Sequence, residues 1–383
     1  MTVTMDRRSF LGAAALLTAS PVLFAQAATE RRFVFIIQRG AADGLSTVIP
    51  YAEPAYARLR GALAIDPASA LKLNGTFALH PSLAKLAELY AAGEASFFHA
   101  VASPYRDRSH FDGQNVLETG GRAAYQVKDG WMNRLVGMLP RRGKDAIAFS
   151  PAVPVALRGP AEVTTYAPSA LPQANDDLML RVEQLYAGDS QLHALWSSAL
   201  DARGMAGEKS GGERRQDAAA LGRIAAGFLA RADGPRIAMI ETLGWDTHSG
   251  QNARLAGQLR SLDHLVGALR DAMGVAWSQT VVLVATEFGR TVAANGTGGT
   301  DHGTGAVAML IGGRVQGGRV VADWPGLLPA DLHEGRDLRP TLALDRLLAS
   351  ACAETFGIDP DRTARMLFPD SARGEPMERL LRA

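Results

Sequence analysis

Carboxylate and imidazole side chains are concentrated in a few short polar segments of this 383-residue chain. Asp246 and His248 lie two residues apart in one segment, and His302 lies in another. One carboxylate with two imidazoles offers the nitrogen and oxygen donors that suit zinc, manganese or iron. Asp and His also cap helices, and residues 249–251 begin a predicted helix, so the Asp246–His248 pair by itself favours capping. With His302 nearby, the same residues favour a metal site.

Two further carboxylates, Asp43 and Glu287, follow predicted strands. Asp43 precedes Gly44, and Asp-Gly is a common turn dipeptide. Glu287 has Arg290 three residues further on as a salt-bridge partner. For each carboxylate, the structural role and metal ligation are equally supported.

Ser109 and His110 place a hydroxyl next to an imidazole. Adjacent side chains point apart in extended chain, so adjacency alone does not make them a catalytic pair. Ser109 is also a candidate cap for a helix predicted over residues 111–117. Arg39 and Arg108 carry planar guanidinium groups suited to holding an anion, although solvated surface charge is the commoner role of any single arginine.

Apolar patterning predicts the elements that position these groups. Strands are predicted at residues 33–37, 95–101, 236–240, 281–284 and 306–311, and helices at 81–90, 130–139, 175–200, 221–229, 251–273 and 340–356. This alternation favours a single parallel sheet covered by helices on both faces. Right-handed crossovers would place the polar segments along one sheet edge. Residues 203–217 are almost free of apolar side chains and are predicted as an exposed loop, not as a domain boundary.

The composition is that of a globular protein, with 47% hydrophobic and 21% charged residues. Without residues 1–27, acidic and basic side chains are equal in number, which gives no reason to expect nucleic acid as a partner. Cys352 is the single cysteine, so an internal disulfide and a cysteine-cluster metal site are excluded.

The first 27 residues have the features of a twin-arginine signal peptide. Arg7 and Arg8 precede an apolar stretch over residues 12–25, and small residues at 25–27 suit cleavage. We expect one mature domain over residues 28–383, exported in folded form by the twin-arginine translocase to the periplasm or outside the cell. The apolar stretch is too short and too rich in alanine for a stable membrane anchor.

The polar segments and the leader together resemble an uncharacterised bacterial family, domain-of-unknown-function family 1501. The segments that carry this resemblance, in chain order, are residues 38–45, 109–112, 245–248, 287–290 and 301–303. The resemblance covers nearly all of the mature chain. That family is similar to a distant branch of the alkaline phosphatase and sulfatase superfamily, which implies a doubly wound, mainly parallel α/β sheet.

The resemblance also implies roles for individual residues. Asp246, His248 and His302 match the ligands of one metal, and this set is complete. Asp43 and Glu287 match the second metal site, where Phe288 stands in place of an imidazole. Ser109 matches the nucleophile, with Ser103 as the reserve.

We therefore expect an exported hydrolase of a phosphate or sulfate ester, acting on a small molecule or a polymer. It would use a divalent metal such as zinc, manganese or calcium. Arg39 or Arg108 would hold the non-bridging oxygens, and His110 would donate a proton. The alternative is a non-catalytic exported binding or assembly protein on the same fold, which the missing imidazole at Phe288 favours.

Overall fold

The computed structural model describes residues 30–141, 143, 145–167, 182, 183, 185, 186, 188–197, 217–371 and 375–382. Its main sheet has nine strands in the order β11 (Arg319–Val321), β5 (Ala95–Ala102), β10 (Ala306–Ile311), β9 (Thr280–Thr286), β1 (Arg32–Gln38), β8 (Ile237–Thr242), β6 (Ala146–Phe149) and β7 (Thr164–Thr165), with β12 (Leu342–Ala343) beside β5. A small sheet joins β2 (Val48–Ile49), β4 (Ala78–Leu79) and β3 (Leu71–Lys72).

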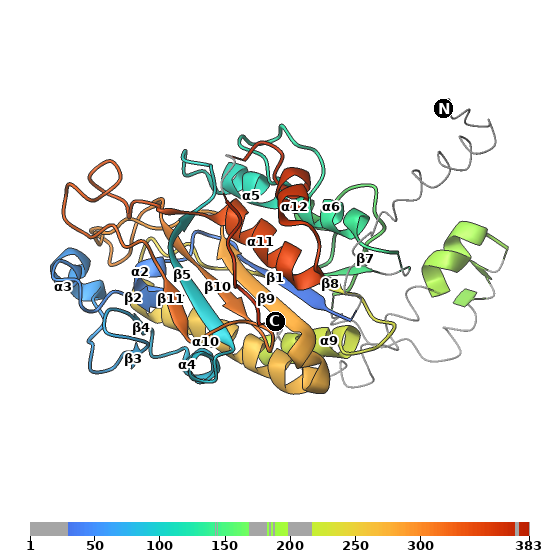
Figure 1. Ribbon diagram of the computed structural model, residues 1–383, viewed down its shortest axis with the longest axis horizontal. Helices are drawn as coiled ribbons and strands as arrows, with labels where there is room; N and C mark the ends of the chain where they lie inside the picture. Colours follow the sequence, from blue (N-terminus) through green and yellow to red (C-terminus); the bar gives the residue numbers. More distant parts are fainter. Residues whose placement is uncertain are drawn as a thin grey trace, which may run out of the picture.

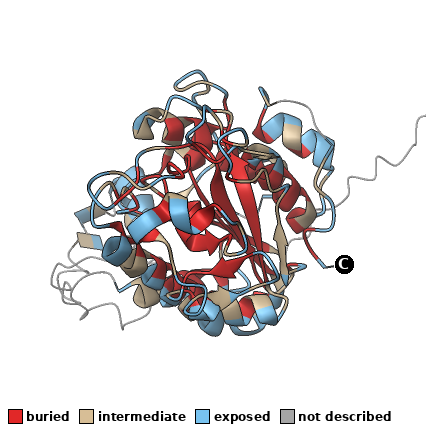
Figure 2. Ribbon diagram, turned by 90° about the vertical axis from the view of Figure 1, so that its left-hand side faces the viewer, coloured by how far each residue is buried: buried red, intermediate tan, exposed pale blue. Residues whose placement is uncertain are grey.

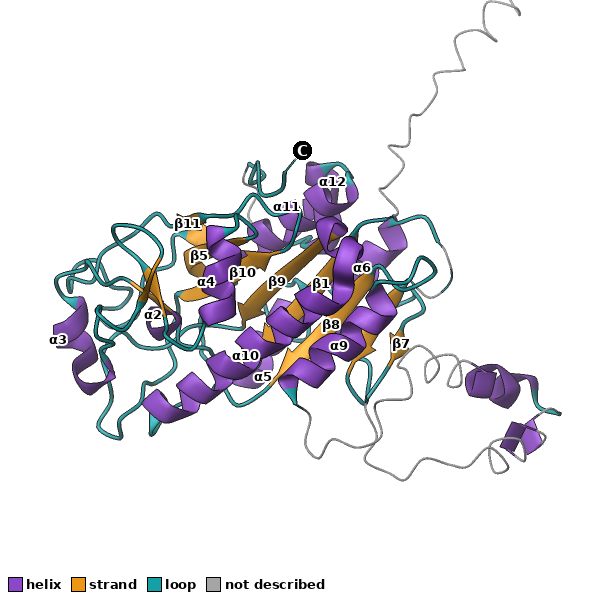
Figure 3. Cartoon of the chain, turned by 90° about the horizontal axis from the view of Figure 1, so that it is seen from below, coloured by secondary structure: helices purple, strands orange, loops and turns teal. Residues whose placement is uncertain are grey.

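The helices form two layers, one on each face of the main sheet. One layer contains α5 (His110–Thr119), α6 (Trp131–Met138), α11 (Leu344–Phe356) and α12 (Pro360–Leu367), and the other contains α4 (Ala84–Ala91), α9 (Ala218–Leu229) and α10 (Gln251–Met273) (Figures 1 and 3). Short helices occur at α2 (Gly44–Thr47), α3 (Tyr56–Arg60), η1 (Gly61–Leu63), η2 (Val155–Leu157) and η4 (Gly274–Gln279).

The two faces of β1 contribute to two separate hydrophobic cores. Phe33, Phe35 and Ile37 pack in the core below α6 and α11, whereas Val34 and Ile36 pack in the core below α9 and α10. Successive side chains of a strand point to opposite faces, so a strand covered on both sides must be apolar throughout. Figure 2 shows these buried strands enclosed by helices with exposed outer surfaces.

The sheet is mostly parallel, and β10 is its antiparallel member. β1 pairs in parallel with β8 and β9, but β10 runs antiparallel to β9 and β5. The predicted doubly wound, mainly parallel α/β class is confirmed, and β10 is the strand that departs from the parallel arrangement. The glycine-rich loop between β9 and β10 returns the chain directly, without a crossover helix, which makes neighbouring strands antiparallel.

The five predicted strands and the helices predicted around residues 81–90, 130–139, 221–229, 251–273 and 340–356 are present. The signal peptide, much of the predicted helix 175–200 and nearly all of the predicted loop 203–217 lie outside the described residues. The single-domain organisation stays a prediction. Within the described chain, none of the helices combines the length and apolar character needed to span a bilayer.

His99 is a fully buried histidine of β5, and it gives the fold a pH dependence. Its Nε2 lies 2.9 Å from the carbonyl oxygen of Val48, and its Nδ1 accepts a hydrogen bond from the backbone N–H of Ala100. These contacts fit the neutral ring with a proton on Nε2 alone. Burial lowers the pKa of His99 to about 4.

We expect His99 to reduce the free energy of unfolding by about 2 kcal/mol between pH 7 and pH 5. The unfolded chain binds a proton at this residue near its ordinary pKa, whereas the folded chain does so only near pH 4. Falling pH therefore favours unfolding over this window. Urea titrations at both pH values would measure the loss, and His99→Gln should lack this component because its amide does not titrate. An identical pH dependence in wild type and His99→Gln would contradict the assignment.

Candidate metal centre

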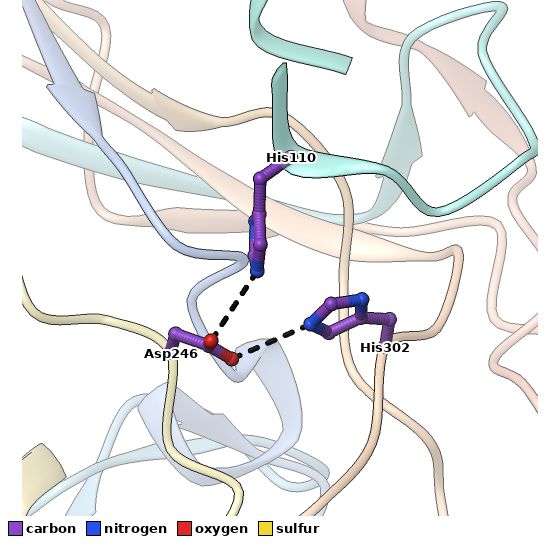
Figure 4. Close-up of side chains that lie close together, drawn as sticks. All are labelled: His110, Asp246 and His302. Atoms are coloured by element: carbon purple, nitrogen blue, oxygen red, sulfur yellow. Dashed lines mark ion pairs between the residues drawn. The ribbon is translucent and has the colours of Figure 1, made fainter. Parts of the chain in front are cut away.

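Three donor side chains meet at one edge of the main sheet, at the ends of β8 and β9 and the starts of β10 and α5. Asp246 follows β8, His302 precedes β10, and His110 is the first residue of α5. Because β10 is antiparallel to β9, its first residues lie at the sheet edge where β9 ends. Figure 4 shows both imidazoles directed at the carboxylate of Asp246.

The spacing of the donor atoms fits one cation. His110 Nε2 lies 3.5 Å from Asp246 Oδ2, and His302 Nε2 lies 3.4 Å from Asp246 Oδ1. One ligand atom from each of these three residues can be chosen so that all lie within 4.8 Å of one another. Ligands at about 2.1 Å from a tetrahedral zinc ion are roughly 3.4 Å apart. The two distances from an imidazole nitrogen to a carboxylate oxygen therefore match the separation of two ligands on one metal ion.

His248 adds a fourth donor, an imidazole nitrogen, to the set of His110, Asp246 and His302. Its Nε2 lies 3.1 Å from Asp246 Oδ1 and 3.0 Å from His302 Nε2. Its side chain is 44% exposed, so the centre opens to solvent on this side. The predicted set of Asp246, His248 and His302 is thus brought together, and His110, expected as a proton donor, lies with it.

Glu287 fixes the orientation of the His110 ring. The carboxylate is fully buried, and its Oε1 lies 2.8 Å from His110 Nδ1. The same oxygen accepts hydrogen bonds from Gly40 N–H at 2.9 Å and from the Gln114 amide at 3.1 Å. With a proton on Nδ1, the Nε2 lone pair of His110 points to Asp246. That Nε2 is buried and has no hydrogen-bond partner in the described part of the chain.

The other two imidazoles are held in the same way through Nδ1. His302 Nδ1 lies 2.9 Å from the backbone carbonyl oxygen of Arg108, and His248 Nδ1 lies 3.1 Å from Asp301 Oδ1. An acceptor at Nδ1 sets the tautomer that leaves Nε2 free to bind a metal. All three rings therefore present Nε2 toward Asp246.

Neighbouring hydrogen-bond donors and one buried arginine keep Asp246 and Glu287 ionised. Burial of Asp246 works against its charge, but the hydrogen bond and charge of Arg290, whose NH1 lies 2.7 Å from Oδ1, hold the pKa of Asp246 below its ordinary value. Burial likewise opposes ionisation of Glu287, but hydrogen bonds from His110 and Gln114 lower the pKa of this carboxyl. Hydrogen bonding to Glu287 in turn raises the pKa of His110.

Asp43 is not brought to this cluster. It is fully buried, forms an ion pair with the equally buried Arg60, and accepts a hydrogen bond from the Leu45 N–H at 3.0 Å as the N-cap of α2. Arg60 of α3 supplies the positive charge there. Together with the placement of Glu287 behind His110, this means that the second metal site expected from Asp43 and Glu287 is not assembled among the described residues.

The expected anion-binding arginines have carboxylate partners. Arg39 contacts Glu118 at 2.8 Å and also pairs with Glu241. Arg108 contacts Asp337 at 2.8 Å and Glu334 at 2.5 Å. Each guanidinium is therefore neutralised by two acidic groups.

The candidate nucleophiles differ in surroundings. Ser109 occupies the N-cap position of α5, yet its hydroxyl makes no capping hydrogen bond. The Ser103 hydroxyl is buried and lies 3.4 Å from the backbone carbonyl oxygen of Glu287. Phe288 stacks on His110, with ring centroids 5.1 Å apart, so it forms a wall of the centre where an imidazole was expected.

Sequence patterns missed the residues that hold the ligands in place. Arg290 was considered only as a partner of Glu287, whereas it pairs with Asp246. Gln114, which donates to Glu287, and Asp301, which contacts the His248 ring, were not expected in these roles. The position of Asp301 next to His302 was the one local sign that this carboxylate could contact an imidazole. In the structure it contacts His248 instead of its chain neighbour.

Glu287→Gln is expected to weaken zinc binding by about 10- to 100-fold, because outer partners of a ligating histidine contribute affinity of this size. The substitution preserves side-chain volume and removes the charge that orients His110. Isothermal titration of the metal-free protein with zinc would measure the change. Glu241→Gln, which alters an ion pair of Arg39, is the matched control. Unchanged zinc affinity in Glu287→Gln would show that the carboxylate does not support the metal centre.

One comparison matches most of the chain to a known protein family. Residues 30–367 match the family described as "Protein of unknown function (DUF1501)", as the polar segments led us to expect. No curated protein matches the sequence.

The chain is similar in structure to several solved proteins at low sequence identity. The C-terminal periplasmic domain of EptC from Escherichia coli, in complex with zinc, is 10% identical with a TM-score of 0.43, covering 91% of this chain and 90% of that one. A sulfatase-like protein from Bacteroides thetaiotaomicron is 11% identical with a TM-score of 0.40, covering 90% and 76%. An alkaline phosphatase from an Antarctic bacterium is 11% identical with a TM-score of 0.35, covering 76% and 94%.

Proposed function

The chain belongs to the DUF1501 family of proteins of unknown function, and within it we propose that this protein is an exported, metal-dependent hydrolase of a phosphate or sulfate ester. The observation that carries the proposal is the buried Nε2 of His110, which has no hydrogen-bond partner in the described chain and points at Asp246. Leaving a buried polar atom unpaired is costly. A cation shared with Asp246 and His302 would satisfy it. Export is proposed from the Arg7–Arg8 leader alone.

The donor set fits a divalent ion. Two imidazole nitrogens and a carboxylate oxygen, with His248 as an additional donor, suit zinc or manganese better than calcium, which prefers oxygen. When bound, such an ion polarises an ester oxygen and lowers the pKa of a bound water.

Residues of the chain fix the orientation of the imidazole ligands and supply a candidate nucleophile. Glu287 and the Arg108 carbonyl oxygen fix the rings of His110 and His302. Asp301 holds Nδ1 of His248, so that its Nε2 faces Asp246 as the additional donor. We assign Ser109 as the nucleophile, because its hydroxyl is not committed to capping α5, and Ser103 is the weaker candidate because it is buried.

One observation favours a non-catalytic binding protein instead. Arg39 and Arg108 are each neutralised by two carboxylates, so neither guanidinium offers an uncompensated charge to a phosphate or sulfate group. A metal-binding protein without ester hydrolysis would fit this arrangement.

Protein purified after its native export would discriminate between the two. Two quantities would be measured: the metal content by mass spectrometry, and the rates of hydrolysis of phosphate monoesters, phosphate diesters and sulfate esters before and after chelation. Stoichiometric metal with hydrolysis that is lost on chelation and restored by zinc or manganese supports the hydrolase. Stoichiometric metal with no hydrolysis supports the binding protein, and absence of metal with no hydrolysis overturns the hydrolase proposal.

A further inference from the structure

A groove of about 520 Å³ lies along one side of α5, the helix that begins at His110. Phe111, Gln114, Asn115 and Glu118 line it, and their spacing of three and four residues puts them on one helix face. Its volume is within the range of small-molecule sites. The charged or aromatic side chains that line it elsewhere include Arg39, Tyr125 and Glu241.

Two exposed aromatic rings border this groove. Phe111 is 82% exposed and Tyr125 is 55% exposed, although burial of such rings is normally favourable. Tyr125 adopts the left-handed backbone conformation with φ of 65°, which is costly for a residue other than glycine. Its backbone N–H donates to Asn115 Oδ1 at 2.7 Å, and its hydroxyl is hydrogen-bonded to Asp112. The surface of α5 thus holds an exposed tyrosine in a strained conformation at the edge of the groove.

Three of the charged groups that line the groove pair with one another. Arg39 pairs with Glu118 and Glu241, and it also donates to the Gln114 amide oxygen at 2.9 Å. Arg158, which also lines the groove, donates a hydrogen bond to the backbone carbonyl oxygen of Val153 at 3.0 Å. A ring with an apolar face and a polar rim fits this surface, because aromatic side chains stack on apolar ring faces and the polar groups of the lining can form hydrogen bonds with hydroxyl groups at the rim.

The groove begins beside the candidate metal centre. Gln114 lines the groove and donates to Glu287 Oε1, the same oxygen that holds His110. Gly40, next to Arg39 in the chain, donates to that oxygen as well. Phe111 directly follows His110. A molecule whose ester group lies at the metal centre can therefore extend its organic part into the groove.

We infer that this groove binds a six-membered ring with an apolar face, aryl or pyranosyl, carried by the ester substrate, and that Phe111 and Tyr125 determine this specificity. The inference rests on the proposed function in taking the ring as part of an ester, but the binding of the ring does not require hydrolysis. Neither aromatic residue contacts the metal ligands through a hydrogen bond or ion pair in the described chain.

The test compares binding of phenyl phosphate and glucose 1-phosphate with binding of methyl phosphate, which lacks a ring, to the full mature chain by isothermal titration. We expect at least one ring-bearing ester to bind about fivefold more tightly than methyl phosphate, since stacking on aromatic rings contributes an affinity gain of this order. The preferred ester identifies the ring as aryl or pyranosyl. Equal binding of all three esters, or binding of none, overturns the inference.

Variants assign the preference to the groove. Phe111→Ala and Tyr125→Ala should each bring the ring-to-methyl ratio close to one, whereas Phe111→Trp should keep it. Val275→Ala, which removes an apolar side chain that is 95% exposed on η4, is the control and should keep the wild-type ratio. A ratio unaffected by both alanine variants overturns the inference. If the protein prefers ring-bearing esters but hydrolyses none, the proposed hydrolase function is refuted and ring binding in the groove stands. If it hydrolyses esters without a ring preference, ring binding in the groove is refuted and the hydrolase function stands.

Discussion

Asp246→Asn and His302→Ala are each expected to weaken zinc binding more than about 100-fold, because even outer partners of metal ligands contribute about 10- to 100-fold. Metal-dependent ester hydrolysis should fall below detection in both. Asp246 is the residue to which His110, His248 and His302 all point, so its loss removes the common partner of the donor set.

Asparagine is the informative replacement at Asp246. Its amide oxygen can still accept the hydrogen bond from Arg290, a fully buried guanidinium that an alanine would leave without its carboxylate. A loss of metal binding is then separable from a loss of stability, which thermal unfolding would report. Asp271→Asn changes a surface carboxylate that is 68% exposed and serves as the control. Retention of wild-type zinc affinity in both Asp246→Asn and His302→Ala would refute the metal centre.

Asp43→Ala is expected to lower the free energy of unfolding by about 3–5 kcal/mol, the usual effect of removing one partner of a buried ion pair. It should leave zinc affinity unchanged. Arg60 would stay buried, with hydrogen bonds to the backbone carbonyl oxygens of Thr291 and Val292 but without its counter-ion. Urea unfolding and zinc titration of the same variant measure the two quantities.

The double variant Asp43→Leu with Arg60→Met provides the control for this prediction. Replacing both partners of a buried pair by apolar residues of similar volume is often close to neutral, so the double variant should be more stable than Asp43→Ala. A stable Asp43→Ala that has lost zinc would instead establish Asp43 as a ligand, as the sequence resemblance implied.

Local sequence patterns were sufficient to predict five of the nine strands of the main sheet, but β6, β7, β11 and β12 were not predicted. The apolar run of β1 predicts a strand buried on both faces, and the spacing of apolar residues over 251–273 predicts α10 with the bounds that the structure shows. These patterns depend on a repeat of two or about 3.6 residues, which the chain carries locally. The grouping of Asp246, His248 and His302 was also predicted, because each is adjacent to a recognisable strand.

The partners of the charged groups depended on the tertiary structure. Glu287 meets His110 across 177 positions of sequence, and Arg60 comes from a short helix outside the main sheet to neutralise Asp43. A carboxylate has the same local sequence signature whether it binds a metal, an imidazole or a guanidinium. The sequence by itself determined the five longest strands of the main sheet except for their exact bounds, the sheet edge and the donors available there. Packing alone decided which donor faces which, because a buried charge must be paired and the fold fixes which partner is within reach.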